Sequence, residues 1–436
     1  MSGERSFEVL EKIFKPKNNT KIDEIRGYTM KYGNIVDGEE VIDEVLVSYF
    51  KAPKSYTTEN MCEINSHGGN VIVKKILELC LKNGAELAEP GEFTKRAFLN
   101  GRIDLLQAES VIDVINAKSE REAKTGVKQL EGYLSRELAD IKQKIMDVMV
   151  NIEVAIDYPE YDVDDVTNNQ ISEMLDMVEG KLSVLEKSFD NGKIIKEGIK
   201  TAIIGRPNAG KSSLLNAILK EDRAIVTEYE GTTRDTIEEF VNINGIPLKL
   251  IDTAGIRNAK DEVEKIGIAK SREIANEADL VITIFDSTKE LSNEDLEILE
   301  IAKRKKSIVI LNKIDLESKI DEKDERFDSI KNNIVKISAL NNIGIENIYD
   351  KITNLFNLNE INLDNELVIT NIRHKNLITK AIDNVKKSKE SIKNDMPIDI
   401  IAIYIKDILE DLGNITGEVV SEDIINEIFS KFCLGK

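Results

Sequence analysis

The sequence has no tryptophan and only three cysteines and seven prolines among its 436 residues. The cysteines, Cys62, Cys80 and Cys433, are odd in number and far apart, which argues against a disulfide framework and indicates a reducing, cytoplasmic compartment. Aromatic residues make up 5% of the chain, too few for a broad base-stacking platform. No apolar run reaches the ~18 residues needed to span a bilayer, and no signal-peptide pattern opens the sequence.

Basic side chains are scarce relative to acidic ones: 60 Lys and Arg against 80 Asp and Glu, a formal net charge of −20. This excess argues against nucleic-acid binding along the whole surface, and leaves RNA recognition to a local basic patch or to one completed by a partner. The 41% hydrophobic and 32% charged content fits a globular protein. The length is too great for one core and predicts two to four domains.

The first half of the chain divides into two segments. Residues 1–98 predict a small α+β domain, with β-rich runs at 43–50 and 61–65 and an amphipathic helix at 71–82. Residues 99–197 predict long amphipathic helices, because apolar side chains recur there at three- and four-residue steps.

Helix breaks are also predicted within residues 99–197. The acidic stretch 157–165, which contains Pro159, interrupts the helical pattern. The helix after it is predicted to reach about Phe189 and to be closed by Asn191-Gly192.

The second half begins with an α/β pattern at 198–358. Its short apolar runs are of the kind buried in a parallel sheet, and they lie at 199–204, 248–251, 280–285 and 308–311. Residues 359–436 return to the helical spacing of 99–197. We therefore expect one helical domain interrupted by an inserted α/β domain.

Five motifs typical of guanine-nucleotide switches follow one another in the α/β segment. They are Gly-Arg-Pro-Asn-Ala-Gly-Lys-Ser (205–212), Gly-Thr-Thr-Arg-Asp (231–235), Asp-Thr-Ala-Gly (252–255), Asn-Lys-Ile-Asp (312–315) and Ser-Ala-Leu (338–340). A single match would be a weak hypothesis. Five in order, at plausible spacings, predict GTP binding and hydrolysis.

The motif residues suit the parts of a nucleotide site. Backbone N–H groups of the first motif would hold phosphates, Lys211 would add positive charge, and Ser212 can ligate Mg²⁺. Thr233 is the expected switch threonine that joins Mg²⁺ when the γ-phosphate is present, and Asp252 would hold Mg²⁺ through water. Asp315 can accept two hydrogen bonds from the guanine edge, which adenine cannot supply, so an adenine-specific ATPase fits poorly.

The base pocket and the catalytic water need further groups. Asn312 and Lys313 would shape the pocket, and Ser338-Ala339 would close it. Ile256 stands where many GTPases place a water-orienting glutamine, so another group must position the water. Asn208, inside the phosphate loop, could hold a monovalent cation that replaces an arginine finger. Its alternative role is that of a turn residue.

Residues outside these motifs resemble one family, the tRNA-modifying GTPase MnmE, also called TrmE. They are Ala88-Glu-Pro-Gly-Glu-Phe-Thr-Lys-Arg-Ala-Phe-Leu-Asn100 with Asp104-Leu-Leu-Gln-Ala-Glu109, Ser66-His-Gly-Gly69, and the terminal Cys433-Leu-Gly-Lys436. The resemblance covers nearly the whole chain. It implies a multidomain fold: an N-terminal α+β folate-binding and dimerisation domain (1–98), an α-helical bundle domain (99–197 and 359–436), and an inserted Ras-like α/β P-loop GTPase domain (198–358).

The resemblance also implies an activity. Members of the family are K⁺-stimulated GTPases that form homodimers and work in a heterotetramer with the flavoprotein MnmG (GidA), which carries FAD. Together they add a carboxymethylaminomethyl- or aminomethyl-type group to C5 of the wobble uridine (U34) of certain tRNAs. The one-carbon unit comes from a tetrahydrofolate derivative.

Carried onto this chain, the resemblance assigns roles in hydrolysis to single residues. Asn208 becomes a K⁺ ligand, in a cation loop with Thr227, Tyr229 and Thr232. Glu264 becomes the glutamate that positions the hydrolytic water, for which the alternative is a solvated helix residue. The GTP site as a whole is then assigned to Gly205, Asn208, Ala209, Gly210, Lys211, Ser212, Ser213, Thr227, Thr232, Thr233, Asp252, Gly255, Asn312, Lys313, Asp315, Ser338 and Ala339.

The resemblance assigns the folate pocket to Glu63, Arg102 and Lys436, where Arg102 takes the place of a lysine and so changes the geometry of the charge. It also makes Cys433 necessary for the modification. A cysteine near a chain end is otherwise an apolar filler or a free thiol, and a nucleophilic role would need a lowered pKa.

Two departures from the family pattern stand out. Glu230 replaces a small residue in the cation loop and would bring a carboxylate near the K⁺ site. The family also has further N-terminal residues, including a strand and an arginine that contributes to folate binding. The good match of the remaining domain favours a misassigned start over a short sequence or an incomplete pocket. As written, the missing strand would expose a sheet edge.

Two other functions remain open on the sequence. One is a regulatory GTPase of ribosome assembly, although such proteins usually carry an RNA-binding or second G domain that this chain does not show. The other is a dimeric scaffold that has lost modification activity.

Overall fold

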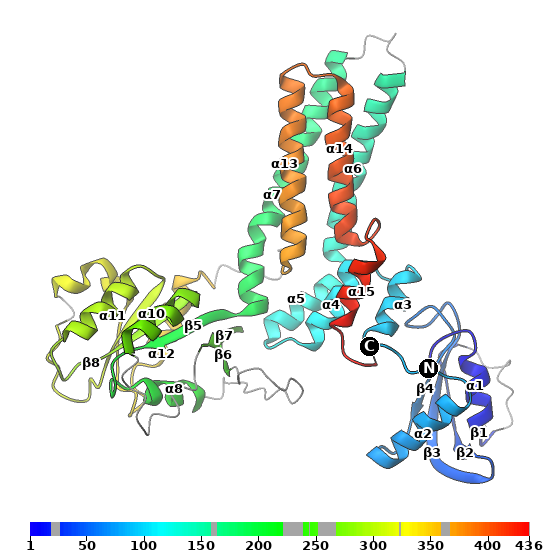
Figure 1. Ribbon diagram of the computed structural model, residues 1–436, viewed down its shortest axis with the longest axis horizontal. Helices are drawn as coiled ribbons and strands as arrows, with labels where there is room; N and C mark the ends of the chain where they lie inside the picture. Colours follow the sequence, from blue (N-terminus) through cyan, green and yellow to red (C-terminus); the bar gives the residue numbers. More distant parts are fainter. Residues whose placement is uncertain are drawn as a thin grey trace. The chain divides into compact units, whose positions relative to one another are not determined.

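The computed structural model describes residues 1–18, 27–157, 164–220, 239–243, 245–251, 267–321, 324–358 and 367–435 (Figure 1). The chain forms two compact units. One comprises Met1–Ile112, Val127–Val178 and Lys380–Lys436, and the other Asp113–Gly126 and Glu179–Thr379. The α/β segment is therefore inserted between helical segments, as the sequence predicts. Within the described ranges, no helix is long and apolar enough to cross a membrane.

The N-terminal domain is an antiparallel sheet with helices on one face. Its elements are α1 (Ser6–Ile13), β1 (Phe14–Pro16), β2 (Thr29–Asp37), β3 (Glu40–Phe50), β4 (Met61–Asn65) and α2 (Asn70–Lys82). The strands pair in the order β1-β2-β3-β4. Alternate side chains of β3, Val45 and Val47, share a buried core with Leu10 of α1 and Ile76 of α2, as the two-residue period of a strand requires. The strands and helix predicted here are confirmed.

The first residues of the chain pair with the outer edge of β4. Met1 and Cys62 exchange main-chain hydrogen bonds of 2.7 and 2.9 Å. The Gly3 N–H donates to the Asn60 carbonyl at 3.0 Å. The prediction of an exposed sheet edge is therefore wrong for Asn60–Cys62, because the start of the chain covers that part of the edge.

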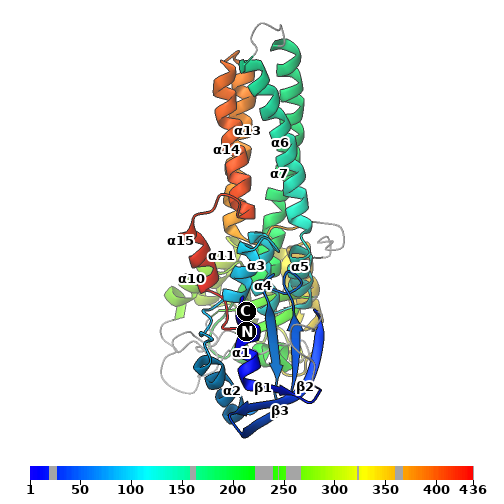
Figure 2. The same ribbon diagram turned by 90° about the vertical axis from the view of Figure 1, so that its right-hand side faces the viewer.

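Helices form the rest of the first unit and its links to the second. They are α3 (Glu92–Leu99), α4 (Leu105–Ile115), α5 (Glu120–Leu130), α6 (Tyr133–Asp157), α7 (Asp164–Glu197), α13 (Ile372–Lys393), α14 (Ile398–Thr416) and α15 (Glu422–Ser430). Within the first unit, α6, the first part of α7, most of α13 and α14 run side by side (Figures 1 and 2). Buried residues at helical spacing line both α6 (Leu138, Ile141) and α14 (Ile405, Ile408), which pack on each other.

The predicted end of the helix near Phe189 is wrong, since α7 continues to Glu197. Gly192 does not stop the helix: it lets the chain approach closely, because a Cβ at this position would lie 2.0 Å from the Ile369 carbonyl oxygen. Ile195 then joins the core of the α/β domain. In the sequence, a glycine that is needed for close packing therefore looks the same as a glycine that ends a helix.

The inserted domain is a mainly parallel sheet between two helical layers. Its elements are β5 (Ile199–Ile204), α8 (Lys211–Lys220), β6 (Glu239–Ile243), β7 (Ile246–Leu250), α10 (Gly267–Glu277), β8 (Leu280–Asp286), α11 (Asn293–Lys303), β9 (Ser307–Asn312), the 3₁₀ helix η2 (Glu325–Asn333), β10 (Ile334–Ile337) and α12 (Glu346–Leu355). The strand order is β10-β9-β8-β5-β7-β6, and only the β6–β7 pair is antiparallel among these described strands.

Two buried cores occupy opposite faces of this sheet. One contains Leu214 of α8 and Ile348 of α12, and the other Ala275 of α10 and Ile298 of α11. Because β5, β9 and β10 are parallel, their carboxyl ends meet at one edge of the sheet. Ligands of open α/β sheets bind at that edge.

Candidate functional site

The phosphate loop joins the carboxyl end of β5 to the first turn of α8. The Lys211 ammonium group donates to the carbonyls of Gly205 and Arg206, at 2.7 and 2.9 Å. Ser212 and Ser213 follow in the first turn of α8, where N–H groups and the helix dipole favour phosphate. The strand–loop–helix context predicted for this motif is confirmed.

Asn208 is exposed and has a left-handed φ of +61°. Asparagine tolerates this conformation better than most residues, in agreement with the turn interpretation. The exposed amide is also accessible to a cation beside the loop. Both interpretations of Asn208 therefore remain predictions.

Arg206 anchors the loop to α11, a contact that the sequence pattern did not indicate. Its guanidinium forms ion pairs with Glu294 and Asp295, both at 3.1 Å. Asp295 is held in turn by a capping box with Ser292 at the start of α11. The loop is therefore tied to a neighbouring helix.

Asn312 joins the loop at 205–212 to the loop after β10 that carries Ser338-Ala339. It ends β9 and is 3% exposed. Its Nδ2 donates to the Ala209 carbonyl at 2.9 Å, and its Oδ1 accepts from the Ala339 N–H at 3.0 Å. Gly210 makes room for this amide, since a Cβ there would lie 2.1 Å from Nδ2. Three of the predicted motifs thus meet in one buried side chain.

Lys313 and Asp315 lie on the loop after β9. Lys313 has a left-handed φ of +68°, and its ammonium group contacts the Asp286 carboxylate at 2.6 Å. Burial opposes ionisation of Asp286, but the hydrogen bonds from Lys313 and Thr288 hold its pKa below the ordinary value. Asp315 is exposed. Sequence reasoning missed Asp286, which ends β8 beside the motif strand.

Ser338 begins the loop that follows β10. Its main chain exchanges hydrogen bonds of 3.0 Å with Ile343, which closes the loop on itself. β10 pairs with β9 in parallel, with Ile337 beside Asn312. Ser338-Ala339 and the Asn-Lys-Ile-Asp motif are therefore neighbours at one sheet edge. That they form a base pocket stays a prediction.

A second group of predicted residues belongs to the first unit. Cys433 is exposed, and its carbonyl accepts a hydrogen bond from the Gly91 N–H at 3.3 Å. The exposed Arg102 guanidinium lies 4.7 Å from the centre of the Tyr56 ring, and Glu63 is exposed on β4. Lys436 lies outside the described residues.

A cavity of about 1100 Å³ lies beside α3, between the N-terminal residues and α15. Its lining includes Ser2, Glu92, Arg96, Asn426 and Phe429. Among the described residues that line it, Glu63, Arg102 and Cys433 do not appear. The cavity therefore does not bring the predicted folate residues together.

Comparisons with known proteins cover the whole chain. The family described as the MnmE helical domain matches residues 105–433, and the one described as the GTP-binding protein TrmE N-terminus matches residues 1–102. The tRNA modification GTPase MnmE of Acetivibrio thermocellus is 50% identical over 440 residues, covering 100% of this chain and 95% of the relative. That of Clostridioides difficile is 49% identical, with the same coverage.

The chain belongs to the MnmE family of tRNA modification GTPases. Among solved structures, the G domain of the T. maritima FeoB iron transporter matches 36% of this chain and 98% of its own length, at 29% identity and a TM-score of 0.27. The two family models and the curated relatives confirm the family resemblance of the sequence.

Several residues that the sequence analysis singles out lie outside the described residues. They are Thr227, Tyr229, Glu230, Thr232, Thr233, Asp252, Gly255, Ile256 and Glu264. The proposed K⁺ and Mg²⁺ sites draw on both described and undescribed parts of the chain. Their ligand sets stay predictions.

The α5 end of the MnmE helical segment packs on the nucleotide domain. Lys118, just before α5, lies 4.0 Å from the centre of the Phe240 ring on β6. Arg121 donates to the Leu358 carbonyl at 3.2 Å. Nothing in the sequence marks these residues, because their partners lie more than 100 positions away. β6 follows the segment that carries Gly-Thr-Thr-Arg-Asp, so the contact links helical residues to the strand after that motif.

Glu122 is buried in the same junction, with 7% of its surface exposed. Its carboxylate accepts the Lys118 N–H at 2.6 Å. Burial raises the pKa of Glu122 to about 7 from an ordinary 4.5, although the hydrogen bond from Lys118 opposes the change. The folded state therefore binds this proton more tightly than the unfolded state does.

We predict that the junction loses stability as pH rises from about 4.5 to about 7. The stabilisation by protonated Glu122 is complete below pH 4.5 and is lost as pH rises through the folded pKa of about 7. The free energy of unfolding should fall by up to about 3 kcal/mol over this range. Glu122→Gln should remove this dependence and raise the melting temperature at pH 8. Melting curves from pH 5 to 8 would measure it, with the exposed Glu120→Gln as control. Identical pH slopes for wild type and Glu122→Gln would contradict the prediction.

Proposed function

We propose that this MnmE-family chain is a K⁺-stimulated GTP hydrolase that acts with the flavoprotein MnmG. Together they would add a carboxymethylaminomethyl- or aminomethyl-type group to C5 of the wobble uridine of certain tRNAs, using a tetrahydrofolate one-carbon unit. The observation that carries the GTP part is the contact of Asn312 with both Ala209 and Ala339, which brings phosphate loop and base pocket together.

The described loop fits a triphosphate. Its main chain runs from β5 into the N-terminus of α8, where N–H groups favour phosphate. The Lys211 ammonium group is held within the loop by the Gly205 and Arg206 carbonyls. Asp315 would accept the guanine hydrogen bonds. Ser212, with Thr233 and Asp252, would hold Mg²⁺. Asn208, with Thr227, Tyr229 and Thr232, would hold K⁺.

Bound Mg²⁺ and K⁺ would supply positive charge where the phosphates gain negative charge in the transition state. Glu264 would then position the attacking water, the role that Ile256 cannot fill. Arg206 is not available as an arginine finger in the described geometry, since its guanidinium is paired with Glu294 and Asp295.

For the modification step, we propose that Arg102, Glu63 and Lys436 contact the folate and that Cys433 takes part in the reaction. A guanidinium suits the carboxylates of a folate. The exposure of Arg102, Glu63 and Cys433 leaves all three accessible to ligand.

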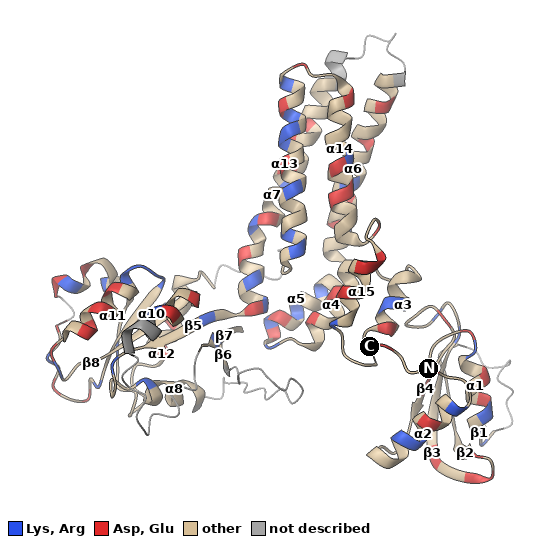
Figure 3. Ribbon diagram, in the orientation of Figure 1, with Lys and Arg blue, Asp and Glu red and all other residues tan. Residues whose placement is uncertain are grey.

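For tRNA, the surface that we favour is the outer face of α13. Lys380, Lys386, Lys387 and Lys393 are exposed along α13, with the exposed Asp383 and Glu390 among them. Figure 3 shows that Lys and Arg recur along this helix. This helix is locally basic, although the chain has a net charge of −20. Because the acidic composition argues against RNA binding along the whole surface, a local basic patch such as this one is where tRNA phosphates would bind.

The N-terminal sheet carries a face that suits the proposed homodimer. Met30, Tyr32 and Leu46 are 57%, 50% and 42% exposed on the side away from α1 and α2. Tyr32 lies directly opposite Leu46 in the β2–β3 register. Apolar side chains clustered on one exposed face mark interaction surfaces.

We predict that Tyr32→Ala weakens self-association by about 10- to 100-fold, because a truncated aromatic anchor typically costs ~2 kcal/mol or more. Sedimentation velocity over a range of protein concentrations would measure the change. Tyr133→Ala is the matched control: both tyrosines are half exposed, and each lies beneath a cation, Lys17 or Arg136. If both variants dimerise like the wild type, this face is not the interface.

The modification itself is tested by reconstitution. Purified protein, MnmG, GTP, K⁺, a methylene-tetrahydrofolate and unmodified tRNA should yield modified U34, detected by mass spectrometry of nucleosides. Omission of folate or the change Lys211→Ala should abolish the product. A folded, GTP-hydrolysing protein that yields no modified uridine would instead indicate the scaffold that has lost this activity.

A further inference from the structure

The C-terminal residues are attached to a turn at the start of α3. Gly91, the N-cap residue of α3, has φ +70° and ψ 4°. Its N–H donates to the Cys433 carbonyl at 3.3 Å. This bond links two positions that are far apart in the sequence and lie within one compact unit.

The turn leaves no room for a side chain at Gly91. A Cβ there would lie 2.9 Å from both the Phe429 carbonyl oxygen and the Phe432 Cβ, distances that real Cβ atoms essentially never show. Phe432 is buried, and its ring lies 5.1 Å from that of Phe429. The backbone before Cys433 therefore rests directly on Gly91.

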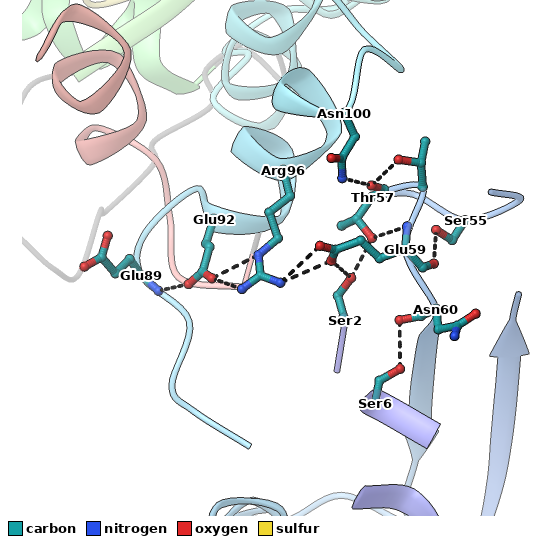
Figure 4. A network of polar contacts seen from close by, with 11 residues as sticks. Ser2, Ser6, Ser55, Thr57, Glu59, Asn60, Glu89, Glu92, Arg96 and Asn100 are labelled. Carbon is teal, nitrogen blue, oxygen red and sulfur yellow. Dashed lines mark hydrogen bonds and ion pairs between the residues drawn. The ribbon is translucent and has the colours of Figure 1, made fainter. Parts of the chain in front are cut away.

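The residues that flank the turn belong to a network of hydrogen bonds and ion pairs (Figure 4). The Glu92 carboxylate accepts from the Glu89 N–H at 2.8 Å and from Arg96 Nε at 3.1 Å. Arg96 extends to Glu59 at 3.1 Å, and Ser2 donates to Glu59 at 2.8 Å. Because Glu92 and Glu89 in this turn are held by these contacts, we expect a side chain added at Gly91 to displace the C-terminal segment rather than the turn.

We propose that Gly91 is a positioning residue for the modification reaction: by admitting Phe429 and Phe432 against the turn and bonding the Cys433 carbonyl, it sets the place of the Cys433 thiol. The inference rests on the proposed role of Cys433 in modification. It assigns a function to the Pro-Gly-Glu turn at 90–92 that does not involve contact with substrate.

Gly101 provides a matched control at the other end of α3. It has the same left-handed φ of +70°, but a Cβ there meets nothing within 4 Å. Gly91→Ala and Gly101→Ala thus both add a Cβ at the same positive φ, where L residues are strained, and only Gly91→Ala crowds the C-terminal segment.

The position of Cys433 is read from a nitroxide spin label on its thiol, in the full-length protein. Cys62 and Cys80 are buried, and burial raises the pKa of both thiols, that of Cys62 to about 11. Labelling therefore favours Cys433. We expect greater label mobility in Gly91→Ala than in the wild type or in Gly101→Ala.

Unlabelled Gly91→Ala should show a modification rate lower by about 10- to 100-fold at saturating folate and tRNA, as misplacement of a reacting group predicts. GTP hydrolysis and KM for tRNA should match those of Gly101→Ala. Unchanged label mobility, or an unchanged modification rate, would overturn the proposal. Cys433→Ser is measured beside Gly91→Ala. If Cys433→Ser modifies tRNA at the wild-type rate, the proposed role of Cys433 is wrong. If Cys433→Ser is inactive but Gly91→Ala modifies tRNA at the wild-type rate, only the proposed role of Gly91 is wrong.

Discussion

Replacing Asp315 with asparagine is expected to lower the affinity for GTP by about 100- to 1000-fold. The Asp315 carboxylate would accept hydrogen bonds from N1–H and the exocyclic amine of guanine. The asparagine amide has one oxygen acceptor and one N–H₂ donor. Its N–H₂ group would face an N–H donor of guanine, so one of the two hydrogen bonds is replaced by a repulsive contact. Hydrogen bonds to charged groups contribute ~1.5–3 kcal/mol each, which gives this loss.

The same change should raise the affinity for xanthosine triphosphate, whose base has a carbonyl in place of the exocyclic amine. Titration with fluorescent GTP and xanthosine triphosphate measures both effects. Asp328→Asn, an exposed aspartate on η2 of the same domain, should bind both nucleotides like the wild type. Equal GTP affinity in Asp315→Asn and wild type would mean that this loop does not read the base.

Asn312→Ala should lower nucleotide affinity and the stability of the inserted domain together. The amide is 3% exposed and holds both the Ala209 carbonyl and the Ala339 N–H. Its removal leaves two polar groups without their partner, at a cost of ~1–3 kcal/mol for each. The free energy of unfolding should fall by about 2–6 kcal/mol, and GDP affinity by at least about tenfold.

Urea denaturation and GDP titration would measure these two effects of Asn312→Ala. The exposed Asn341, close to the same loop, supplies a control, and Asn341→Ala should differ little from the wild type. Wild-type GDP affinity in Asn312→Ala would show that the two loops keep their places without the bridging amide.

Much of the nucleotide site could be predicted from the sequence because its signals are local. Residues 205–212 carry the turn chemistry of a phosphate loop within a few positions, and each buried strand is a short apolar run. The parallel sheet then brings Asn312 and Ser338 to one edge by topology alone. Their meeting in a buried amide follows from that order.

The features that sequence reasoning missed depend on distant partners. In the sequence Gly192 resembles a helix terminator, and only the structure shows that it makes room for the Ile369 carbonyl. Arg121 and Lys118 are ordinary surface cations in the sequence, and only the fold places them on Leu358 and Phe240. Gly91 lies in a motif that carried the family resemblance, and Pro-Gly marks a turn, but no local signal shows what the turn supports.

The contacts of Lys118 and Arg121 at α5 could transmit a conformational change of the proposed GTPase cycle to the helical residues around α5. β6 lies next in the chain after the Gly-Thr-Thr-Arg-Asp motif, and Phe240 on it contacts Lys118. A nucleotide-dependent change in that motif would reach Phe240 along the chain, and through it the contact with Lys118.

The most direct test of the central claim is GTP hydrolysis by the purified protein in K⁺ buffer and in Na⁺ buffer of equal ionic strength. Asn208→Ala and Glu264→Ala are measured beside it. The proposed mechanism predicts strong stimulation by K⁺ that both variants lose, Asn208→Ala through the cation and Glu264→Ala through the attacking water. Equal rates of the wild type in K⁺ and Na⁺ would contradict it.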